Sequence, residues 1–179
     1  ILLDKVADDP SVLVFTETSS NLYNKRFVNS IDNLIFNLTE EEFTSLQPDI
    51  LLTFGGMIVS KKIKKFLRDY SPKEHWHVNE LRAFDTYQVL SKHLKIDSHS
   101  FFKHFCELVD YDNKSTYEST WTYYKQRIRE KHNHYIKTAP YSDLKVFEQV
   151  LKVIPDFSEV QFSNSAIIRY SQLFEMNST

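Results

Sequence analysis

The chain has 179 residues, of which only two are glycine, and its 22 lysine and arginine residues are nearly balanced by 24 acidic residues. Because the two glycines are adjacent, at Gly55 and Gly56, the glycine-rich loops that bind dinucleotides or nucleoside triphosphates are excluded. A net charge of −2 gives no general attraction to nucleic acid or to an anionic membrane. Without a signal peptide or an apolar run of about 20 residues, we expect a soluble cytoplasmic protein.

Short β-rich runs, several of them preceded by a turn signal that contains proline, predict four strands. They cover residues 11–16, 49–54, 75–78 and 159–162. The first two runs are almost continuously apolar, which is typical of strands that are buried on both faces of a parallel sheet.

Helical patterns lie between the predicted strands. Thr39–Glu42 matches a capping box, and apolar residues at helical spacing predict a helix over 59–67. A longer and more polar helix is predicted over 117–135, and another between a cap at Ser142 and a stop at Pro155.

The alternation of strands and helices predicts an α/β fold with a Rossmann-like, open and mostly parallel sheet flanked by helices. Residues 81–141 are mostly helical in pattern, so we expect a helical insertion in the middle of the chain. Both ends resemble interrupted helices, which predicts an excised piece of a longer polypeptide.

The first candidate site follows the predicted strand at 49–54. Gly55 and Gly56 form a turn suited to close backbone approach, and Lys61 and Lys62 fall in the first turns of the next helix. Ligands of α/β sheets bind beyond the carboxyl ends of strands, and cations are disfavoured at a helix N-terminus unless an anion compensates. Either these lysines bind an anionic ligand or they belong to a solvated charged face.

The second candidate site lies near the C-terminal end, where a predicted strand again leads into a helix. Ser165 and Arg169 are four residues apart and so share one helical face. A hydroxyl and a guanidinium can hold a carboxylate between them. The alternative is that Ser165 only caps the helix and Arg169 is a surface residue.

Other reactive side chains give weaker signals. His75 and His77 share a face of a strand, with Glu80 nearby, but a third metal ligand at convincing spacing is missing. Glu17, after the first predicted strand, could be a general base in a ligand-facing loop, but helix caps and turn formers explain this stretch equally well. The single cysteine, Cys106, lies in an aromatic run and is interpreted as a packed helical residue.

Four stretches together resemble the SEPHCHC synthases (2-succinyl-5-enolpyruvyl-6-hydroxy-3-cyclohexene-1-carboxylate synthases, the MenD family), thiamine-diphosphate enzymes of menaquinone biosynthesis. The stretches are 14–21, 48–62, Trp121 and 163–170, and the second and fourth are the specific ones. The resemblance implies the central domain of a three-domain transferase, over residues 1–163, followed by the start of the pyrophosphate-binding domain over 164–179.

The resemblance also implies an activity and a set of site residues. Such enzymes decarboxylate 2-oxoglutarate on thiamine diphosphate with Mg²⁺ and add the resulting carbanion to isochorismate. Lys61 and Lys62 match the cations that face isochorismate, although relatives often have arginine at the second position. Ser165 and Arg169 match the pair that holds substrate carboxylate. The resemblance therefore favours anion binding at both candidate sites.

The catalytic glutamate and the Mg²⁺ motif of this family belong to other domains, so no catalytic residue and no metal ligand are expected here. We expect the fragment alone to be inactive and to bind no cofactor. The implied partners are the other domains of the same chain and further copies in a homo-oligomer. The alternative function is a non-catalytic α/β module that binds a regulatory anion or packs against domains or subunits.

Overall fold

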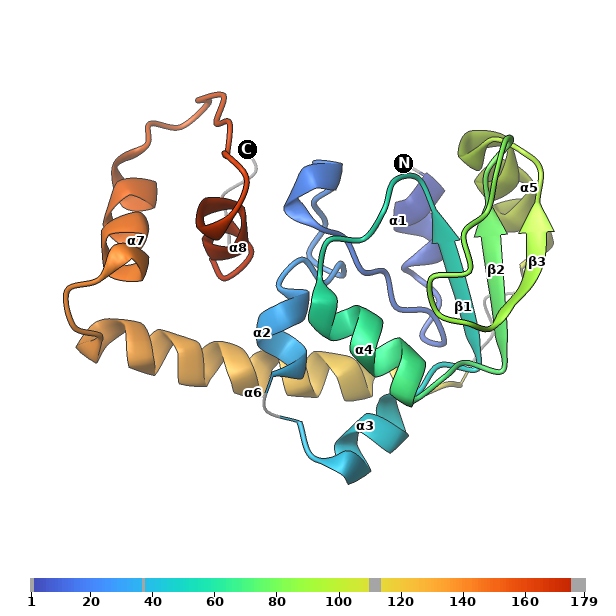
Figure 1. Ribbon diagram of the computed structural model, residues 1–179, viewed down its shortest axis with the longest axis horizontal. Helices are drawn as coiled ribbons and strands as arrows, with labels where there is room; N and C mark the ends of the chain where they lie inside the picture. The colour runs from blue at the N-terminus through green and yellow to red at the C-terminus, as the bar shows by residue number, and fades with distance from the viewer. Residues whose placement is uncertain (1, 37, 110–113, 175–179) are drawn as a thin grey trace.

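The computed structural model describes residues 2–36, 38–109 and 114–174. It has an α/β architecture in which a sheet lies at one end and a long helix extends to the other (Figure 1). The elements in chain order are α1 (Leu2–Val6), η1 (Thr18–Ser20), α2 (Ile31–Ile35), α3 (Glu40–Leu46), β1 (Ile50–Phe54), α4 (Lys61–Asp69), β2 (Glu74–Val78), β3 (Leu90–Leu94), α5 (Ser98–Leu108), α6 (Tyr117–Thr138), α7 (Asp143–Val153) and α8 (Ala166–Ser171).

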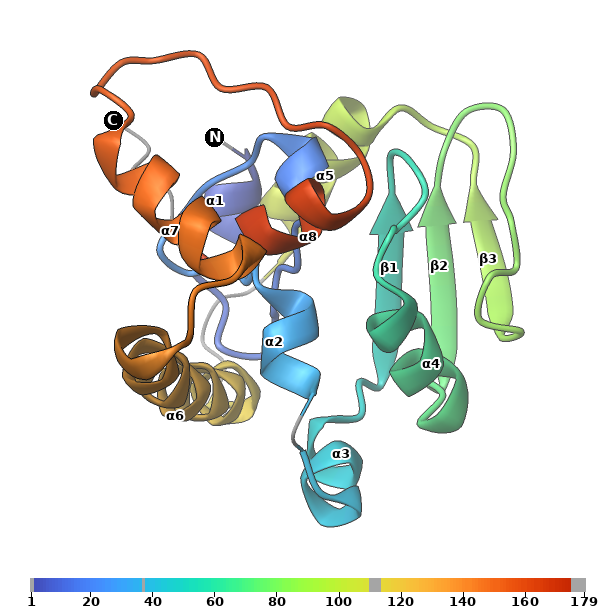
Figure 2. The ribbon, with the colours of Figure 1, turned by 60° about the vertical axis from the view of Figure 1, so that its left-hand side comes forward.

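The sheet has three parallel strands in the order β1-β2-β3, with their carboxyl ends at the same edge (Figure 2). The pairing places Thr53 beside His77, and His77 beside His93. The parallel connection from β1 to β2 runs through α4. The predicted fold class, a parallel sheet flanked by helices, is therefore confirmed.

Two of the predicted strands are confirmed and two are wrong. Residues 49–54 and 75–78 correspond to β1 and β2. Residues 11–16 form no strand, and only Phe15 makes an isolated parallel bridge, to Val28. Residues 159–162 have no strand partner either, and Phe162 instead packs against the ring of Phe147, 5.9 Å away between ring centroids.

β3 lies inside the segment that was predicted to be a mostly helical insertion. Its central residues Ser91, Lys92 and His93 are polar, which suits an edge strand but hides the apolar signal of a buried one. The rest of the insertion is largely helical, as α5 and α6.

The predicted helices are present, with small shifts at their ends. The Thr39–Glu42 capping box forms at the start of α3, and Ser142 caps α7. α4 begins at Lys61 after the cap residue Ser60, so Val59 lies outside the helix and is 49% exposed. None of the helices in the described ranges is long and apolar enough to cross a membrane.

Alternate residues of β1 point into two separate apolar clusters on opposite faces of the sheet. Leu51 contributes to the cluster around Trp121, which is fully buried and which α2, α4 and α6 surround. Phe54 contributes to the cluster of α1 and α5, where it meets Phe102 edge-on at 4.8 Å. Helices therefore cover both faces of the sheet, and α7 and α8 lie beyond it near the far end of α6 (Figures 1 and 2).

Candidate functional site

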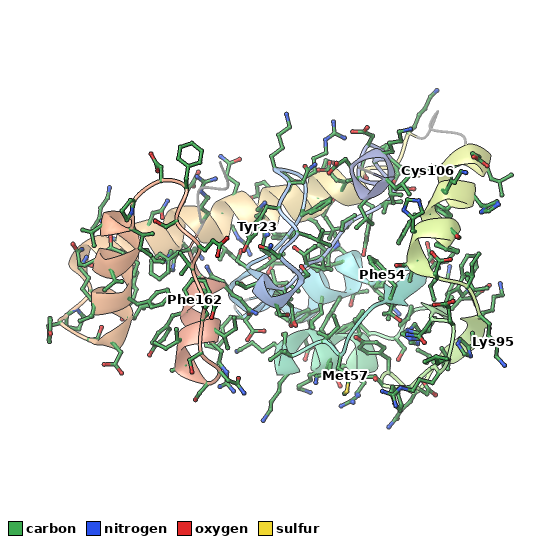
Figure 3. All side chains as sticks on the ribbon, turned by 90° about the horizontal axis from the view of Figure 1, so that it is seen from above. Tyr23, Phe54, Met57, Lys95, Cys106 and Phe162 are labelled. Carbon is green, nitrogen blue, oxygen red and sulfur yellow. The ribbon has the colours of Figure 1, made fainter. Side chains whose placement is uncertain are left out.

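The turn that leaves β1 contains both glycines. Gly55 has a φ of +76°, in the left-handed region that favours glycine, whereas Gly56 has no such requirement. A Cβ atom at either position would meet no heavy atom within 4 Å, so close backbone approach is not the reason for these glycines. Figure 3 labels Phe54, which packs inward, and Met57 of this turn, which is 72% exposed at the periphery.

The backbone immediately before α4 is held by a carboxylate from a distant part of the chain. Glu17 Oε2 accepts from the N–H of Val59 at 2.8 Å, and Glu17 Oε1 accepts from the N–H of Ser60 at 2.7 Å. Glu17 is only 6% exposed. These two N–H groups are thus occupied, and both carboxylate oxygens of Glu17 are bound to the backbone, which does not suit the general base that the sequence suggested.

Lys61 and Lys62 lie in the first turn of α4, as predicted, and both are exposed. The ammonium of Lys62 lies 3.7 Å from the ring centroid of Phe36, a cation–π contact at the surface. The first turn of α4 contains no acidic residue. Both ammonium groups therefore remain accessible to an anion that approaches from solvent.

Arg169 lies on α8 and Ser165 directly before it, and both are exposed. Ser165 precedes the helix but its hydroxyl makes no capping hydrogen bond, so it is not the simple N-cap of the alternative interpretation. Its φ of 78° is unusual for a residue other than glycine and costs on the order of 1–3 kcal/mol. Its hydroxyl and the Arg169 guanidinium are accessible to solvent.

One short loop contacts the chain next to both candidate sites. Glu17 holds the start of α4, and the next residue, Thr18, has its hydroxyl oxygen 3.3 Å from that of Ser171 in α8. Ser171 is 3% exposed, so this face of α8 is packed. No hydrogen bond or ion pair in the described part of the chain joins the lysine pair to Ser165 or Arg169. The structure brings their helices to the same loop but does not bring the four side chains together.

In the structure, His75 and His77 belong to a hydrogen-bonded group on the sheet. Thr53 Oγ1 lies 2.8 Å from both His75 Nε2 and His77 Nδ1. His93, on the unpredicted strand β3, is the neighbour of His77, and its Nε2 lies 2.7 Å from the carbonyl oxygen of Asn79. Across the residues that the structure describes, no three or more His, Cys, Asp or Glu side chains are placed to hold a metal ion.

The single hydroxyl proton of Thr53 constrains the protonation of this group. Thr53 can donate to only one histidine and must accept from the other. Since His75 Nδ1 is buried without a partner, the least costly arrangement puts a proton on His75 Nε2, which donates to Thr53. Burial, followed by the neighbouring histidine, lowers the pKa of both His75 and His77, which favours the neutral form of both rings at neutral pH.

Cys106 is confirmed as a packed helical residue. It lies on α5, half-buried against the apolar cluster of α1 and α5, and its Sγ is 3.6 Å from the carbonyl oxygen of Leu2. Figure 3 shows it between these two helices.

Sequence reasoning did not find the polar group at the far end of the molecule. Glu148 of α7 is 6% exposed and forms ion pairs with Lys145 and Lys152 on the same helix. The neighbouring His132 of α6 packs edge-on against the ring of Phe174, and burial lowers its pKa. The only sequence signal was the spacing of three and four residues that brings both lysines to Glu148.

Comparisons with known proteins place this geometry in context. Residues 13–160 match a family model described as the middle domain of thiamine pyrophosphate. The chain is 44% identical to the 2-succinyl-5-enolpyruvyl-6-hydroxy-3-cyclohexene-1-carboxylate synthase of Flavobacterium psychrophilum, over 99% of this chain and 32% of that protein. It is 47% identical to the synthase of the same name from Christiangramia forsetii, over 97% of this chain and 31% of that protein.

A more distant relative gives the same picture. The synthase of the same name from Porphyromonas gingivalis is 33% identical, over 97% of this chain and 31% of that protein. The chain thus spans about a third of the length of the curated relatives that it matches.

Proposed function

Because the chain belongs to the family of thiamine pyrophosphate enzyme middle domains, we propose that it is the middle domain of a SEPHCHC synthase and supplies cations that bind substrate carboxylates. The intact synthase would convert 2-oxoglutarate and isochorismate, both of which carry two carboxylates. Residues 164–179 would begin the pyrophosphate-binding domain, although 175–179 lie outside the described residues. A cytoplasmic location and a homo-oligomeric state belong to the same proposal.

Two observations on the described residues bear on where thiamine diphosphate and Mg²⁺ bind. The backbone N–H groups before α4 are bound by Glu17, and the described ranges contain no cluster of metal ligands. As part of the same proposal, we assign the cofactor, Mg²⁺ and the catalytic groups to the parts of the synthase outside this chain. The contribution of this chain is to bind and orient the substrates.

The observation that carries the proposal is the exposed pair Lys61 and Lys62 at the start of α4. Two adjacent cations are electrostatically unfavourable at a helix N-terminus, and an incoming carboxylate would relieve that cost. Each ammonium acts as a mobile point charge, which suits isochorismate carboxylates reached from solvent. Ser165 and Arg169 would hold a substrate carboxylate from α8, the guanidinium by paired hydrogen bonds.

Steady-state kinetics of the full-length synthase test this function. Replacing Lys61, Lys62 or Arg169 with alanine should lower kcat/KM for one of the two substrates by about 10- to 100-fold, the effect of losing a charge-assisted hydrogen bond. Lys65→Ala is the matched control, because Lys65 lies on the same helix in a surface pair with Asp69. Unchanged kinetics in all three variants would favour the packing alternative.

One observation favours a packing role in addition. Apolar side chains with helical spacing are exposed along α7 and before it: Val146, Val150, Val153 and Tyr141. Together with neighbouring polar residues they line a shallow hollow of about 340 Å³. If this hollow packs against another domain or subunit, Val150→Ser should change the oligomeric state or the thermal stability of the synthase, while the lysine variants should change neither.

A further inference from the structure

Glu17 is a buried carboxylate whose partners are backbone N–H groups at the start of α4. Its two oxygens lie 3.0 and 2.8 Å from the nitrogen of Val59, and Oε1 lies 2.7 Å from the nitrogen of Ser60. A carboxylate that accepts several N–H bonds in a buried place is a strong and directional anchor. The anchor acts on the residue directly before Lys61.

Ser60 is fixed from a second direction as well. Its hydroxyl donates to Asp32 Oδ1 of α2 and accepts from the N–H of Ile63 at 3.1 Å. Ser60 is 4% exposed, so the last residue before the lysine pair is both buried and fully bonded. The direction in which α4 leaves this point, and hence where Lys61 and Lys62 lie, is set by these contacts.

Glu17 also occupies part of the anion-binding position that a helix N-terminus offers. In many proteins the free N–H groups at a helix N-terminus bind an anion directly. Here an internal carboxylate already binds the N–H groups of Val59 and Ser60, and the exposed side chains of Lys61 and Lys62 remain available to a substrate carboxylate. The negative charge of Glu17 at this end also offsets part of the unfavourable interaction of two cations with the helix dipole.

We propose that Glu17 is a positioning residue for the lysine pair: it anchors the start of α4 so that Lys61 and Lys62 are held where isochorismate binds. This inference rests on the proposed function, because it assigns those lysines to substrate. Glu17 touches no substrate itself and acts through the backbone of Val59 and Ser60.

Kinetics of the full-length synthase with Glu17→Ala and Glu17→Gln test the inference. Glu17→Ala should raise KM for isochorismate about tenfold or more, the equivalent of about 1.4 kcal/mol, with a smaller change in kcat and in KM for 2-oxoglutarate. Glu17→Gln keeps one oxygen acceptor for Ser60 and should recover part of the loss. Glu41→Gln, at an exposed position of α3, is the control and should match the wild type.

A purely structural role for Glu17 has a different signature. Loss of folded enzyme lowers the apparent kcat by the same factor whichever substrate is varied, and it leaves both KM values unchanged. That result would overturn the proposal. If Glu17→Ala does not fold, Glu17→Gln decides by the same criterion.

A third variant separates failure of this inference from failure of the proposed function. In a Lys61→Ala, Lys62→Ala background, Glu17→Gln should have no further effect on KM for isochorismate, because the side chains that it positions are gone. If the lysine variants raise this KM and the Glu17 variants do not, only the positioning role is wrong. If the lysine variants leave it unchanged, the proposed function fails and the inference fails with it.

Discussion

Thr53→Val should loosen the sheet locally, because it removes the one hydroxyl that joins His75 to His77 while keeping the shape of the side chain. The bond to His77 contributes about 1 kcal/mol, and the N–H of His75, a residue that is 1% exposed, would be left buried without a partner at a cost of about 1–3 kcal/mol. The predicted destabilisation of β1 and β2 is therefore about 2–4 kcal/mol.

Hydrogen–deuterium exchange of the intact synthase measures this loss without requiring a single unfolding transition. Amides of β1 and β2 that exchange by local opening should exchange about 30-fold to almost 1000-fold faster in Thr53→Val, at 1.4 kcal/mol for each factor of ten. Thr53→Ser keeps the hydroxyl and should stay much closer to the wild type. Equal exchange in Thr53→Val and the wild type would refute the assigned hydrogen-bond network.

Two further predictions concern the same region. Burial lowers the pKa of His75 and His77 in the folded state below the value of about 6.5 that histidine has in an unfolded chain. Near and below pH 6.5 these two residues therefore bind more protons in the unfolded state than in the folded state, and acidification destabilises the fold. Exchange protection of β2 should thus be constant above about pH 7.5 and fall as the pH drops through 6.5, and a rise in protection on acidification would contradict this sign. Gly55→Ala should destabilise the β1–α4 turn by about 1 kcal/mol because of its positive φ, whereas Gly56→Ala should be nearly neutral in a thermal unfolding scan; equal effects would contradict the conformational explanation.

The sequence predicted burial better than it predicted strand pairing. Residues 11–16 are apolar because alternate side chains enter both clusters, Val12 and Val14 on the side of α1 and α5, Leu13 and Phe15 on the side of Trp121. The pattern therefore reported two-sided burial correctly. It could not report that this segment has only one isolated bridge as a partner, since pairing depends on residues elsewhere in the chain.

The candidate site was predicted in the same partial way. Local signals placed Lys61 and Lys62 in the first turn of a helix after a glycine turn, which the structure has. The anchoring carboxylate comes from Glu17, more than forty positions earlier, and no local pattern links it to Val59. A contact of that kind is fixed by the tertiary fold, in which the loop after residue 16 lies against the start of α4.

The central claim is that this domain supplies cations to a substrate, and the Lys61→Ala, Lys62→Ala double variant of the full-length synthase tests it most directly. Initial rates measured against isochorismate at saturating 2-oxoglutarate should show KM raised by about tenfold or more, with Lys65→Ala unchanged. A double variant with the KM and kcat of the wild type would contradict the claim and leave the domain with a packing role alone.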